Sequence, residues 1–437
     1  MERHPHISEY SRKLTDPATG VETIRSGATI VPGAGAAEPP ALLHAIARRV
    51  REGDLKNLKV YSFLPMKHAM RSVLAADLAD VIESYTWFVG GGDRSRVRVG
   101  LSYFIPNYFH QIPMLCREHM DIDVTVTTVS PMDKAGYFSF GTSNDFISTA
   151  ARCAKRLIVE VNENMPRVFG ASLLHVSEVD AIVENHAPLL QVISPPPAPE
   201  DAGICARVAE MIPDGATIQL GYGGIPNQVA ALLSSHKDLG IHTELFSTGM
   251  VELIENGVAT GRRKTLHPLK NVFTTALGDK KTYQFMHDNP SMESYPVSYV
   301  NDPAVIAQND RMISVNTILE VDLTGQCNAE SMEGYQFSGT GGQLDFVRGA
   351  ALSREGKSIL AFHATARKGR VSRIVPRLSA GTVTSTPRAD TQYLVTEYGA
   401  VNLKGKSTRD RALDIISLAH PQFRDELLKE AEEMYLL

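Results

Sequence analysis

The sequence carries one pattern twice, and this repeat limits the folds that the chain can adopt. Blocks 27–50 and 215–233 both begin with GATI, continue into a glycine turn and end in a stretch typical of a helix. A strand followed by a turn and a helix is the basic unit of α/β proteins. The matching turn glycines, at the same spacing in both blocks, are Gly33 and Gly35 in the first block and Gly221 and Gly223 in the second.

Further matches follow in the same order along the chain. Segments 130–146 and 321–346 each contain an Asp, a turn glycine and a glycine-bearing loop that ends in Asp-Phe. The segments that begin at Cys153 and His175 also have counterparts in the second half. Several weak matches in one order are far less expected by chance than any single match, so we infer two copies of one βα-rich unit.

The duplication predicts an α/β protein of two similar open α/β domains, and a length of 437 residues agrees with two domains. We expect an N-terminal domain over residues 1–193, a Pro-rich linker, SPPPAPED, over 194–201, and a C-terminal domain over 202–437. Ligands of open α/β sheets bind beyond the carboxyl ends of the strands. We therefore expect the active site in the cleft between the two domains.

The first functional difference between the two copies is an acid, Glu244, which only the second copy carries. The stretch 240–249, GIHTELFSTG, alternates in the manner of a short strand, and alignment of the halves places Lys59 opposite Glu244. A carboxylate in a strand beside a sheet core is costly unless it is paired, hydrogen-bonded or used, although an edge-strand acid that faces water is an alternative. Because only the second half carries this acid, Glu244 is the candidate catalytic residue.

The second difference is a glycine-rich insertion within 337–346, which reads FSGTGGQLDF. Backbone N–H groups of such a loop can come close to an anion or a developing oxyanion, because glycine has no side chain. A mobile surface loop is the alternative that the composition leaves open.

Charge and cysteine content narrow the class of protein. A net charge of -5 and a pI near 6.3 provide no basic field for nucleic acid. The four cysteines form no CxxC pair, the amino terminus lacks the apolar core of a signal peptide, and no apolar run approaches the length of a membrane span. We therefore expect a cytoplasmic protein with no membrane partner.

The histidines include no HExxH spacing, so we expect no bound metal.

Three other motifs indicate nucleotide or anion binding only weakly. LGYGGIPN, at 220–227, lacks the dinucleotide fingerprint because Pro226 stands where its third glycine belongs. LKGKST, at 403–408, lacks the earlier glycine of a P-loop and favours a helix start or a solvated patch. The basic run 367–377 is interpreted as a charged surface hairpin, and attraction of CoA phosphates or of a second substrate carboxylate is the alternative.

Taken together, seven motifs resemble the acetyl-CoA hydrolase/transferase family, which includes the 4-hydroxybutyrate, butyrate and itaconate CoA-transferases. The resemblance runs from Gly27 to the end of the chain. The motifs that carry it are SPMDKAGYFSFGTS, VEVNENMPR, GIHTELFSTGMVELIENG, VNDP, EVDLTGQCNAES, GTGGQLDF and VTEYGAVNLKGKS.

The resemblance implies roles for particular residues. Glu244 would be the nucleophile, and the backbone of Gly342 and the side chain of Asn301 would stabilise the oxyanion. The turn at 221–223 would lie along the thiol end of CoA, and the loop at 339–342 would cover CoA. The residues expected to contact CoA are Gly221, Tyr222, Gly223, Gly339, Thr340, Gly341 and Gly342.

The implied activity is that of a CoA-transferase of the EC 2.8.3 type. It would move CoA from an acyl-CoA, such as acetyl-, butyryl- or succinyl-CoA, to a short-chain carboxylic acid through a glutamyl-CoA thioester. Acetate, butyrate, 4-hydroxybutyrate, succinate and itaconate all fit as acceptors. CoA and acyl-CoA would be substrates, with no tightly bound cofactor, and we also expect a homo-oligomer, a dimer or a tetramer. An acyl-CoA hydrolase of the same family, a dinucleotide-dependent oxidoreductase and a CoA-sensing module are the alternatives.

Overall fold

The computed structural model describes residues 5–193, 198–221 and 223–437. Part of the expected linker, residues 194–197, and the expected CoA contact at Tyr222 lie outside the described residues. Among the described residues, no helix is both long and apolar enough to cross a membrane.

The chain divides into two compact units. The first contains Met1–Ile193, Phe246–Thr248 and Val272–Val300, and the second contains Ser194–Leu245, Gly249–Asn271 and Asn301–Leu437. Two short segments of the second half of the sequence are thus grouped with the first unit. The domain boundaries expected along the sequence stay a prediction.

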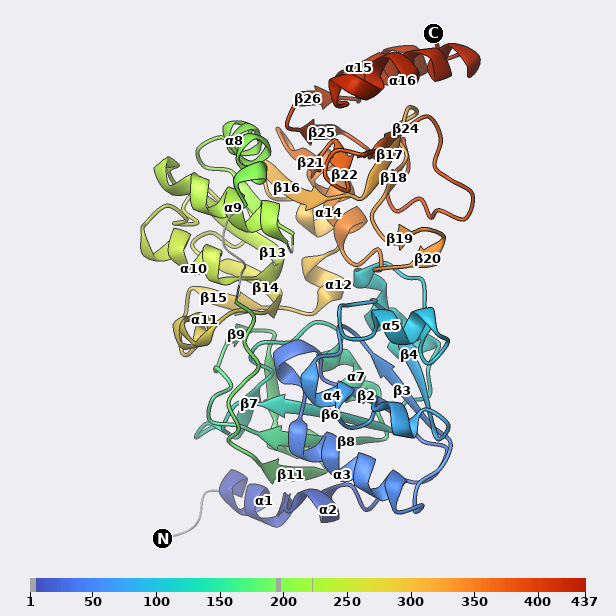
Figure 1. Cartoon of the computed structure of the whole chain (residues 1–437). Helices are drawn as coiled ribbons and strands as arrows, with labels where there is room; N and C mark the ends of the chain where they lie inside the picture. The colour runs from blue at the N-terminus through green and yellow to red at the C-terminus, as the bar shows by residue number, and fades with distance from the viewer. Residues whose placement is uncertain (1–4, 194–197, 222) are drawn as a thin grey trace. The chain divides into compact units, whose positions relative to one another are not determined.

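The first unit is built on a parallel sheet with the strand order β1-β11-β8-β6-β2-β3-β4-β5 (Figure 1). Its central strand, Val124–Val129, has the sequence VTVTTV, in which every residue is β-branched and buried. Such residues fit the pleated surface of a strand that is covered on both faces. In the order given, the strands are Leu14–Thr15, Ala181–Glu184, Arg156–Val161, Val124–Val129, Thr29–Pro32, Leu58–Ser62, Ile82–Thr86 and Tyr103–Phe104.

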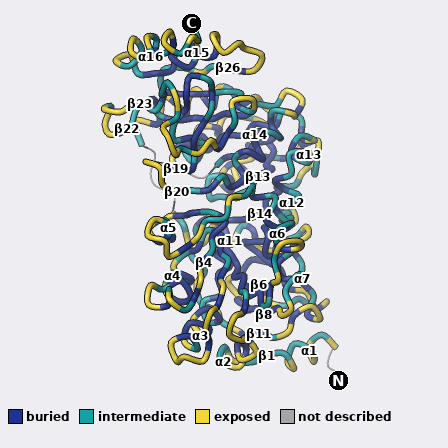
Figure 2. The backbone as a smooth tube through the Cα atoms, turned by 90° about the vertical axis from the view of Figure 1, so that its right-hand side faces the viewer, coloured by how far each residue is buried: buried dark blue, intermediate teal, exposed yellow. Residues whose placement is uncertain are grey.

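Alternate residues of these strands enter two separate cores. Ile158 packs in one core with residues of helix α3 (Pro40–Arg51), whereas Leu157 and Val159 pack in the other with residues of α7 (Ile147–Cys153). Successive side chains of a strand point to opposite faces, so helices cover both faces of this sheet. In Figure 2 the strands β6 and β8 accordingly run in the colour of buried residues.

The remaining elements of the first unit are short. Strands β7 and β10 form an antiparallel pair, and β9 pairs in parallel with β15. The elements are α1 (Pro5–Lys13), α2 (Pro17–Gly20), α4 (Lys67–Met70), α5 (Arg94–Arg98), α6 (Ile112–Glu118), β7 (Tyr137–Ser139), β9 (Phe169–Gly170), β10 (Leu173–His175), β14 (Asn271–Ala276), α11 (Lys280–Met286), β15 (Met292–Ser294) and α12 (Val297–Val300).

The second unit contains a sheet whose strands follow the order β26-β25-β21-β16-β12-β13 (Figure 1). All neighbouring pairs in it are parallel except β25–β26. In the order given, the strands are Gly399–Asn402, Tyr393–Thr396, Lys357–Ala361, Met312–Thr317, Thr217–Leu220 and Gly240–Phe246.

Smaller strands and helices complete the second unit. The strands are β17 (Glu320–Asp322), β18 (Cys327–Asn328), β19 (Ser331–Met332), β20 (Tyr335–Gln336), β22 (Thr365–Ala366), β23 (Val371–Ser372) and β24 (Ile374–Val375). The helices are α8 (Ala202–Glu210), α9 (Gly224–Leu232), α10 (Thr248–Glu255), α13 (Pro303–Ile306), α14 (Gln343–Leu352), α15 (Thr408–Ser417) and α16 (Pro421–Glu433).

The strand order confirms the internal duplication. The order β11-β8-β6-β2-β3 in the first unit corresponds to β25-β21-β16-β12-β13 in the second. The two GATI blocks provide β2 and β12, and the segments aligned at Lys59 and Glu244 provide β3 and β13. The expected α/β fold with two similar units is therefore confirmed, whereas a site in a cleft between them stays a prediction.

Candidate active site

Glu244 lies near the carboxyl end of β13, which confirms the strand expected there. Ile241, His242 and Thr243 are fully buried, whereas Glu244 is partly exposed. The strand pairs in parallel with β12 through Thr217 and Ile218 on β12. A buried strand thus fixes the backbone of Glu244 and leaves its carboxylate accessible at the strand end, where ligands of open α/β sheets bind.

Two donors hold this carboxylate. Nδ2 of Asn301 donates to Oε2 of Glu244 over 2.7 Å, and the backbone N–H of Gly342 also donates to the carboxylate. A Cβ atom on Gly342 would lie 1.7 Å from Oε2 of Glu244 and 2.2 Å from Nδ2 of Asn301. The contact therefore requires glycine at position 342. The structure brings these three sequence-predicted residues together.

Local capping fixes the positions of both donors. Gly342 is the N-cap of α14. Asn301 stands directly before Asp302, whose carboxylate accepts from the N–H of Ala304 over 2.8 Å and caps α13. Side-chain acceptors at an N-cap fix the start of a helix. The motifs VNDP and GTGGQLDF thus act as helix starts that present an amide and a backbone N–H.

Burial, together with the negative charge of Asp345, raises the pKa of Glu244 from 4.5 to about 7, although the hydrogen bonds from Asn301 and Gly342 lower it. Asp345 is buried on the first turn of α14, and its Oδ2 lies 3.4 Å from Nδ2 of Asn301. No sequence motif assigned a site role to Asp345. The Asp-Phe match between the two halves was the available signal, but it identified a shared skeleton and no function.

The glycine-rich loop is anchored to a buried acid, Glu330. The hydroxyl of Thr340 lies 3.1 and 3.2 Å from the two carboxylate oxygens of Glu330, and the hydroxyl of Ser385 donates to one of them over 2.9 Å. The backbone N–H groups of Phe337 and Ser338 donate to the carbonyl of Glu330. These bonds favour a held loop over the mobile surface loop that composition left open. The motif EVDLTGQCNAES contains Glu330, but nothing in the motif indicated its partner 10 residues later.

The turn after β12 also requires glycine. A Cβ on Gly221 would lie 2.8 Å from Oδ1 of Asn316, which is held by a reciprocal amide pair with Gln219. Gly223 has φ +142° and is the N-cap of α9. Tight packing thus explains Gly221, and the backbone conformation explains Gly223. The turn follows the carboxyl end of β12, the strand that neighbours Glu244's own strand.

The other sequence motifs form ordinary structural elements. The basic run forms the β22–β23 hairpin, which confirms the expected charged hairpin, and Arg367 pairs there with Glu333 over 2.5 Å. LKGKST leads into α15, and its Ser407 is the N-cap, which confirms the expected helix start. Within the described part of the chain, no three His, Cys, Asp or Glu side chains are grouped so that they could hold a metal ion.

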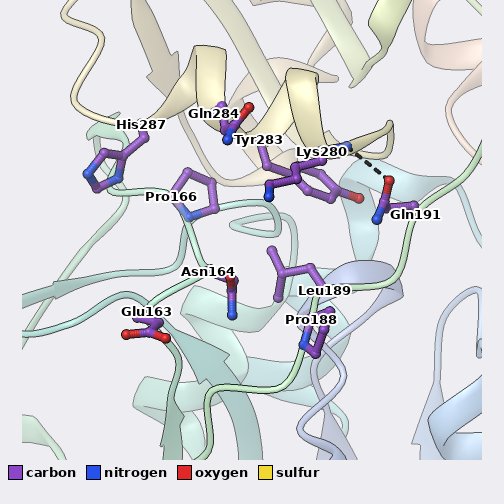
Figure 3. Close-up of a pocket in the computed structure, with 10 residues that line it drawn as sticks. All are labelled: Glu163, Asn164, Pro166, Pro188, Leu189, Gln191, Lys280, Tyr283, Gln284 and His287. Carbon is purple, nitrogen blue, oxygen red and sulfur yellow. Dashed lines mark hydrogen bonds between the residues drawn. The ribbon is translucent and has the colours of Figure 1, made fainter.

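The first unit contains a separate pocket of about 380 Å³ (Figure 3). It lies between α11 and the loops that follow β8 and β11. Its charged side chains, Glu163 and Lys280, are exposed, and the backbone N–H of Lys280 donates to the side chain of Gln191 over 3.1 Å. Solvated surface charges of this kind need no ligand. The partly buried carboxylate of Glu244, held by Asn301 and Gly342, is therefore the stronger candidate site.

Comparison with known proteins identifies the family. The N-terminal domain model of acetyl-CoA hydrolase/transferase matches residues 1–194, and the C-terminal domain model matches residues 278–431. The succinyl-CoA:cyclohexane-1-carboxylate CoA transferase of Geobacter metallireducens is 41% identical, over 99% of this chain and 98% of its own length. The 4-hydroxybutyrate coenzyme A transferase of Clostridium kluyveri is 42% identical, over 98% of this chain and 99% of its own.

A solved structure agrees with these matches. The crystal structure of RipA from Yersinia pestis has a TM-score of 0.95 and 49% identity, and the alignment covers 99% of this chain and 100% of RipA. The family expected from the seven motifs is thereby confirmed: the chain belongs to the acetyl-CoA hydrolase/transferase family.

Proposed function

We propose that this protein is a CoA-transferase that moves CoA from an acyl-CoA to a short-chain carboxylic acid, with Glu244 as nucleophile. One observation carries the proposal. Nδ2 of Asn301 holds Oε2 of Glu244, and the backbone N–H of Gly342 also donates to this carboxylate at the end of β13. A carboxylate fixed in this way is suited to attack a thioester carbonyl.

The first two steps follow from that geometry. Oε1 of Glu244 attacks the acyl carbonyl carbon, the carbon–sulfur bond breaks, and CoA leaves as a thiolate, so that Glu244 becomes part of a mixed anhydride. The thiolate then attacks the glutamyl carbonyl carbon, and the bond from that carbon to the acyl-bearing oxygen breaks. A free carboxylate leaves, and Glu244 carries CoA as a thioester.

The two donors are placed for the second step. When the thiolate adds to the glutamyl carbonyl, negative charge develops on the remaining glutamyl oxygen, Oε2. Nδ2 of Asn301 already faces that oxygen and the N–H of Gly342 already donates to the same carboxylate, so no donor has to move as the charge develops. Pre-placed donors of this kind are usually the largest single contribution to catalysis of acyl transfer. Attack by the incoming acid reverses the two steps.

The proposed function also includes the residues that contact CoA, the oligomeric state and the cellular location. The turn at Gly221, Tyr222 and Gly223 lies along the thiol end of CoA, and the loop from Gly339 to Gly342 covers it. The steps transfer acyl groups and no electrons, so CoA and acyl-CoA are substrates and no further cofactor takes part. We also propose a homo-oligomer in the cytoplasm, where the four free cysteines would stay reduced.

Transfer, as opposed to hydrolysis, is supported by the names of the two relatives that match over the full length, both CoA-transferases. The acceptor class is a short-chain acid, with acetate, butyrate, 4-hydroxybutyrate, succinate and itaconate as the set to test. The expected result is ping-pong kinetics with at least one of these acids, with acyl-CoA products identified by mass spectrometry. Release of free CoA at the same rate with and without every acid would instead identify a hydrolase.

The transfer rate should depend on the ionisation of Glu244. Only the carboxylate attacks, and its pKa is raised to about 7 from 4.5, so the rate should rise with pH through that value. Below about pH 6 the rate should fall roughly tenfold for each pH unit. The measurement is kcat/KM for acyl-CoA as a function of pH. An acid limb near 4.5, the ordinary value for a glutamate, would contradict the described environment of Glu244.

Removal of the acid that anchors the loop should weaken CoA binding. Glu330→Ala leaves the hydroxyls of Thr340 and Ser385 without their acceptor, and loss of a buried charged hydrogen bond costs about 1.5–3 kcal/mol. We expect the KM for acyl-CoA to rise at least ~10-fold. Glu333→Ala is the matched control, because Glu333 is exposed on the same segment and pairs with Arg367. Equal KM values in the two variants would disprove the anchoring role.

A further inference from the structure

The side-chain amide of Asn301 stands between two carboxylates. Its Nδ2 lies 2.7 Å from Oε2 of Glu244 and 3.4 Å from Oδ2 of Asp345. Asn301 is fully buried and Asp345 is 2% exposed. The NH2 group of one amide therefore faces both acids.

The carbonyl of the same amide has no partner. Oδ1 of Asn301 is buried and accepts no hydrogen bond from the described residues. An unsatisfied buried acceptor costs about 1–3 kcal/mol. A turn of the amide by half a rotation would place Oδ1 against carboxylate oxygens, which cannot donate when ionised. Of the two orientations of the Asn301 amide, the one with NH2 toward the acids is therefore lower in free energy, although it leaves Oδ1 unsatisfied. Each of the two acids contributes to this preference.

The equivalent acid of the first unit is used differently. Asp145, the Asp of the matching Asp-Phe pair, is the acceptor for the N–H groups of Phe146 at 2.7 Å and Ile147 at 3.0 Å, for the hydroxyl of Thr275 at 3.0 Å and for that of Ser143. That acid has a structural role at the start of α7. Asp345 instead lies within the first turn of α14, and its carboxylate faces the site amide.

A second carboxylate beside Glu244 has an electrostatic cost. Asp345 raises the pKa of Glu244, because two negative charges that lie close together oppose each other's ionisation. The Asp-Phe pair alone does not require this arrangement, since Asp145 of the first unit is bound by hydroxyls and by the N–H groups of Phe146 and Ile147. The contact with Nδ2 of Asn301 offsets part of this cost.

We propose that Asp345 is a positioning residue that acts through Asn301. It holds the amide so that NH2 faces Oε2 of Glu244, the oxygen on which charge develops when CoA adds to the glutamyl carbonyl. The proposal rests on the proposed function, in which Asn301 is an oxyanion donor. Asp345 itself touches neither CoA nor the reacting carbon.

The proposal predicts how Asp345→Asn affects the reaction. Without the second acceptor, Asn301 loses part of the preference that keeps its NH2 toward Glu244, and removal of one oxyanion donor typically costs ~100–1,000-fold. Partial loss of that donor should lower the rate of glutamyl-CoA formation at saturating acyl-CoA by ~10–100-fold. The KM for acyl-CoA should change less than ~3-fold, because the substitution leaves Glu330 and its hydrogen bonds with Thr340 and Ser385 in place.

A double-mutant cycle with Asn301→Ala tests the proposed route. If Asp345 acts through Asn301, Asp345→Asn should cause little further loss, below ~3-fold, once the amide is absent. Asp345→Glu keeps a carboxylate and should restore part of the rate that Asp345→Asn loses. Asp390→Asn is the matched control: it removes the ion pair with Arg348 on the same helix, α14, and should leave the rate within ~2-fold.

The outcomes separate this proposal from the proposed function. Multiplicative losses in the cycle, or an equal loss in Asp390→Asn, would overturn the positioning role while Glu244 remained the nucleophile. If Asp345→Asn does not fold, the same cycle is run with Asp345→Glu, whose smaller loss must also vanish in the Asn301→Ala background. Absence of any glutamyl-CoA adduct in the wild-type protein would disprove the proposed function itself.

Discussion

Glu244→Ala should lose nearly all CoA transfer, by ~10,000-fold or more, because binding alone cannot replace a missing nucleophile. Glu244→Asp should also be severely impaired, since its carboxylate is withdrawn by one methylene from Asn301 and Gly342, and a misplacement of about 1 Å can cost ~100-fold. Glu244→Gln is a subtler case, because slow reaction of the amide with CoA would restore some activity. The measurement is the steady-state transfer rate with each purified variant.

Glu252→Ala is the matched control for these variants. Glu252 is exposed on α10, the helix that follows β13, and its carboxylate is solvated. Its removal should leave the transfer rate within ~2-fold, as is usual for a surface substitution. A Glu244→Ala variant that transfers CoA at a rate close to that of Glu252→Ala would refute the assignment of the nucleophile.

Gly342→Ala should have the second largest effect. The added methyl carbon would lie 1.7 Å from Oε2 of Glu244 and 2.9 Å from its Cδ, so the carboxylate or the loop must move. The backbone of Gly342 has φ -96°, which alanine adopts without strain, and the effect is therefore steric. We expect a loss of ~100–1,000-fold in kcat, comparable with the removal of an oxyanion donor.

A second glycine provides the comparison for this variant. Gly203 lies in α8, has no positive φ, and a Cβ added there meets no atom within 4 Å. Gly203→Ala should keep full activity and gain a little stability, because alanine favours a helix interior. Equal activities for the two alanine variants, with both proteins folded, would show that Gly342 is not pressed against the nucleophile.

Helices and strands that follow from a short stretch of the sequence could be predicted. The stretch typical of a helix at the end of block 27–50 is α3, and the strand expected around Glu244 is β13. The stretch typical of a helix at the end of block 215–233 is α9. It begins at Gly224, because Gly223 takes the N-cap with a conformation open only to glycine, and a separate short turn at 233–235 follows it. Boundaries set by backbone conformation are harder to predict than the elements themselves.

The residues of the candidate site that belong to recognisable motifs could be predicted from the sequence. Glu244, Asn301 and Gly342 were expected from the resemblance, and the structure places them in contact. Asp345 and Glu330 were missed, because their roles depend on contacts with Asn301 and Ser385, which are 44 and 55 residues away. A buried acid is recognisable only once the fold shows which donors surround it.

The central claim is that Glu244 carries CoA during the reaction, and chemical trapping tests it most directly. The wild-type protein is mixed with acyl-CoA in the absence of an acceptor acid, reduced with borohydride, digested and analysed by peptide mass spectrometry. We predict that the glutamyl-CoA thioester is reduced to an alcohol at Glu244 alone, and that Glu244→Ala shows no reduced peptide. A reduced residue at another acid, such as Glu397, Glu330 or Asp345, with Glu244 unmodified, would contradict the account.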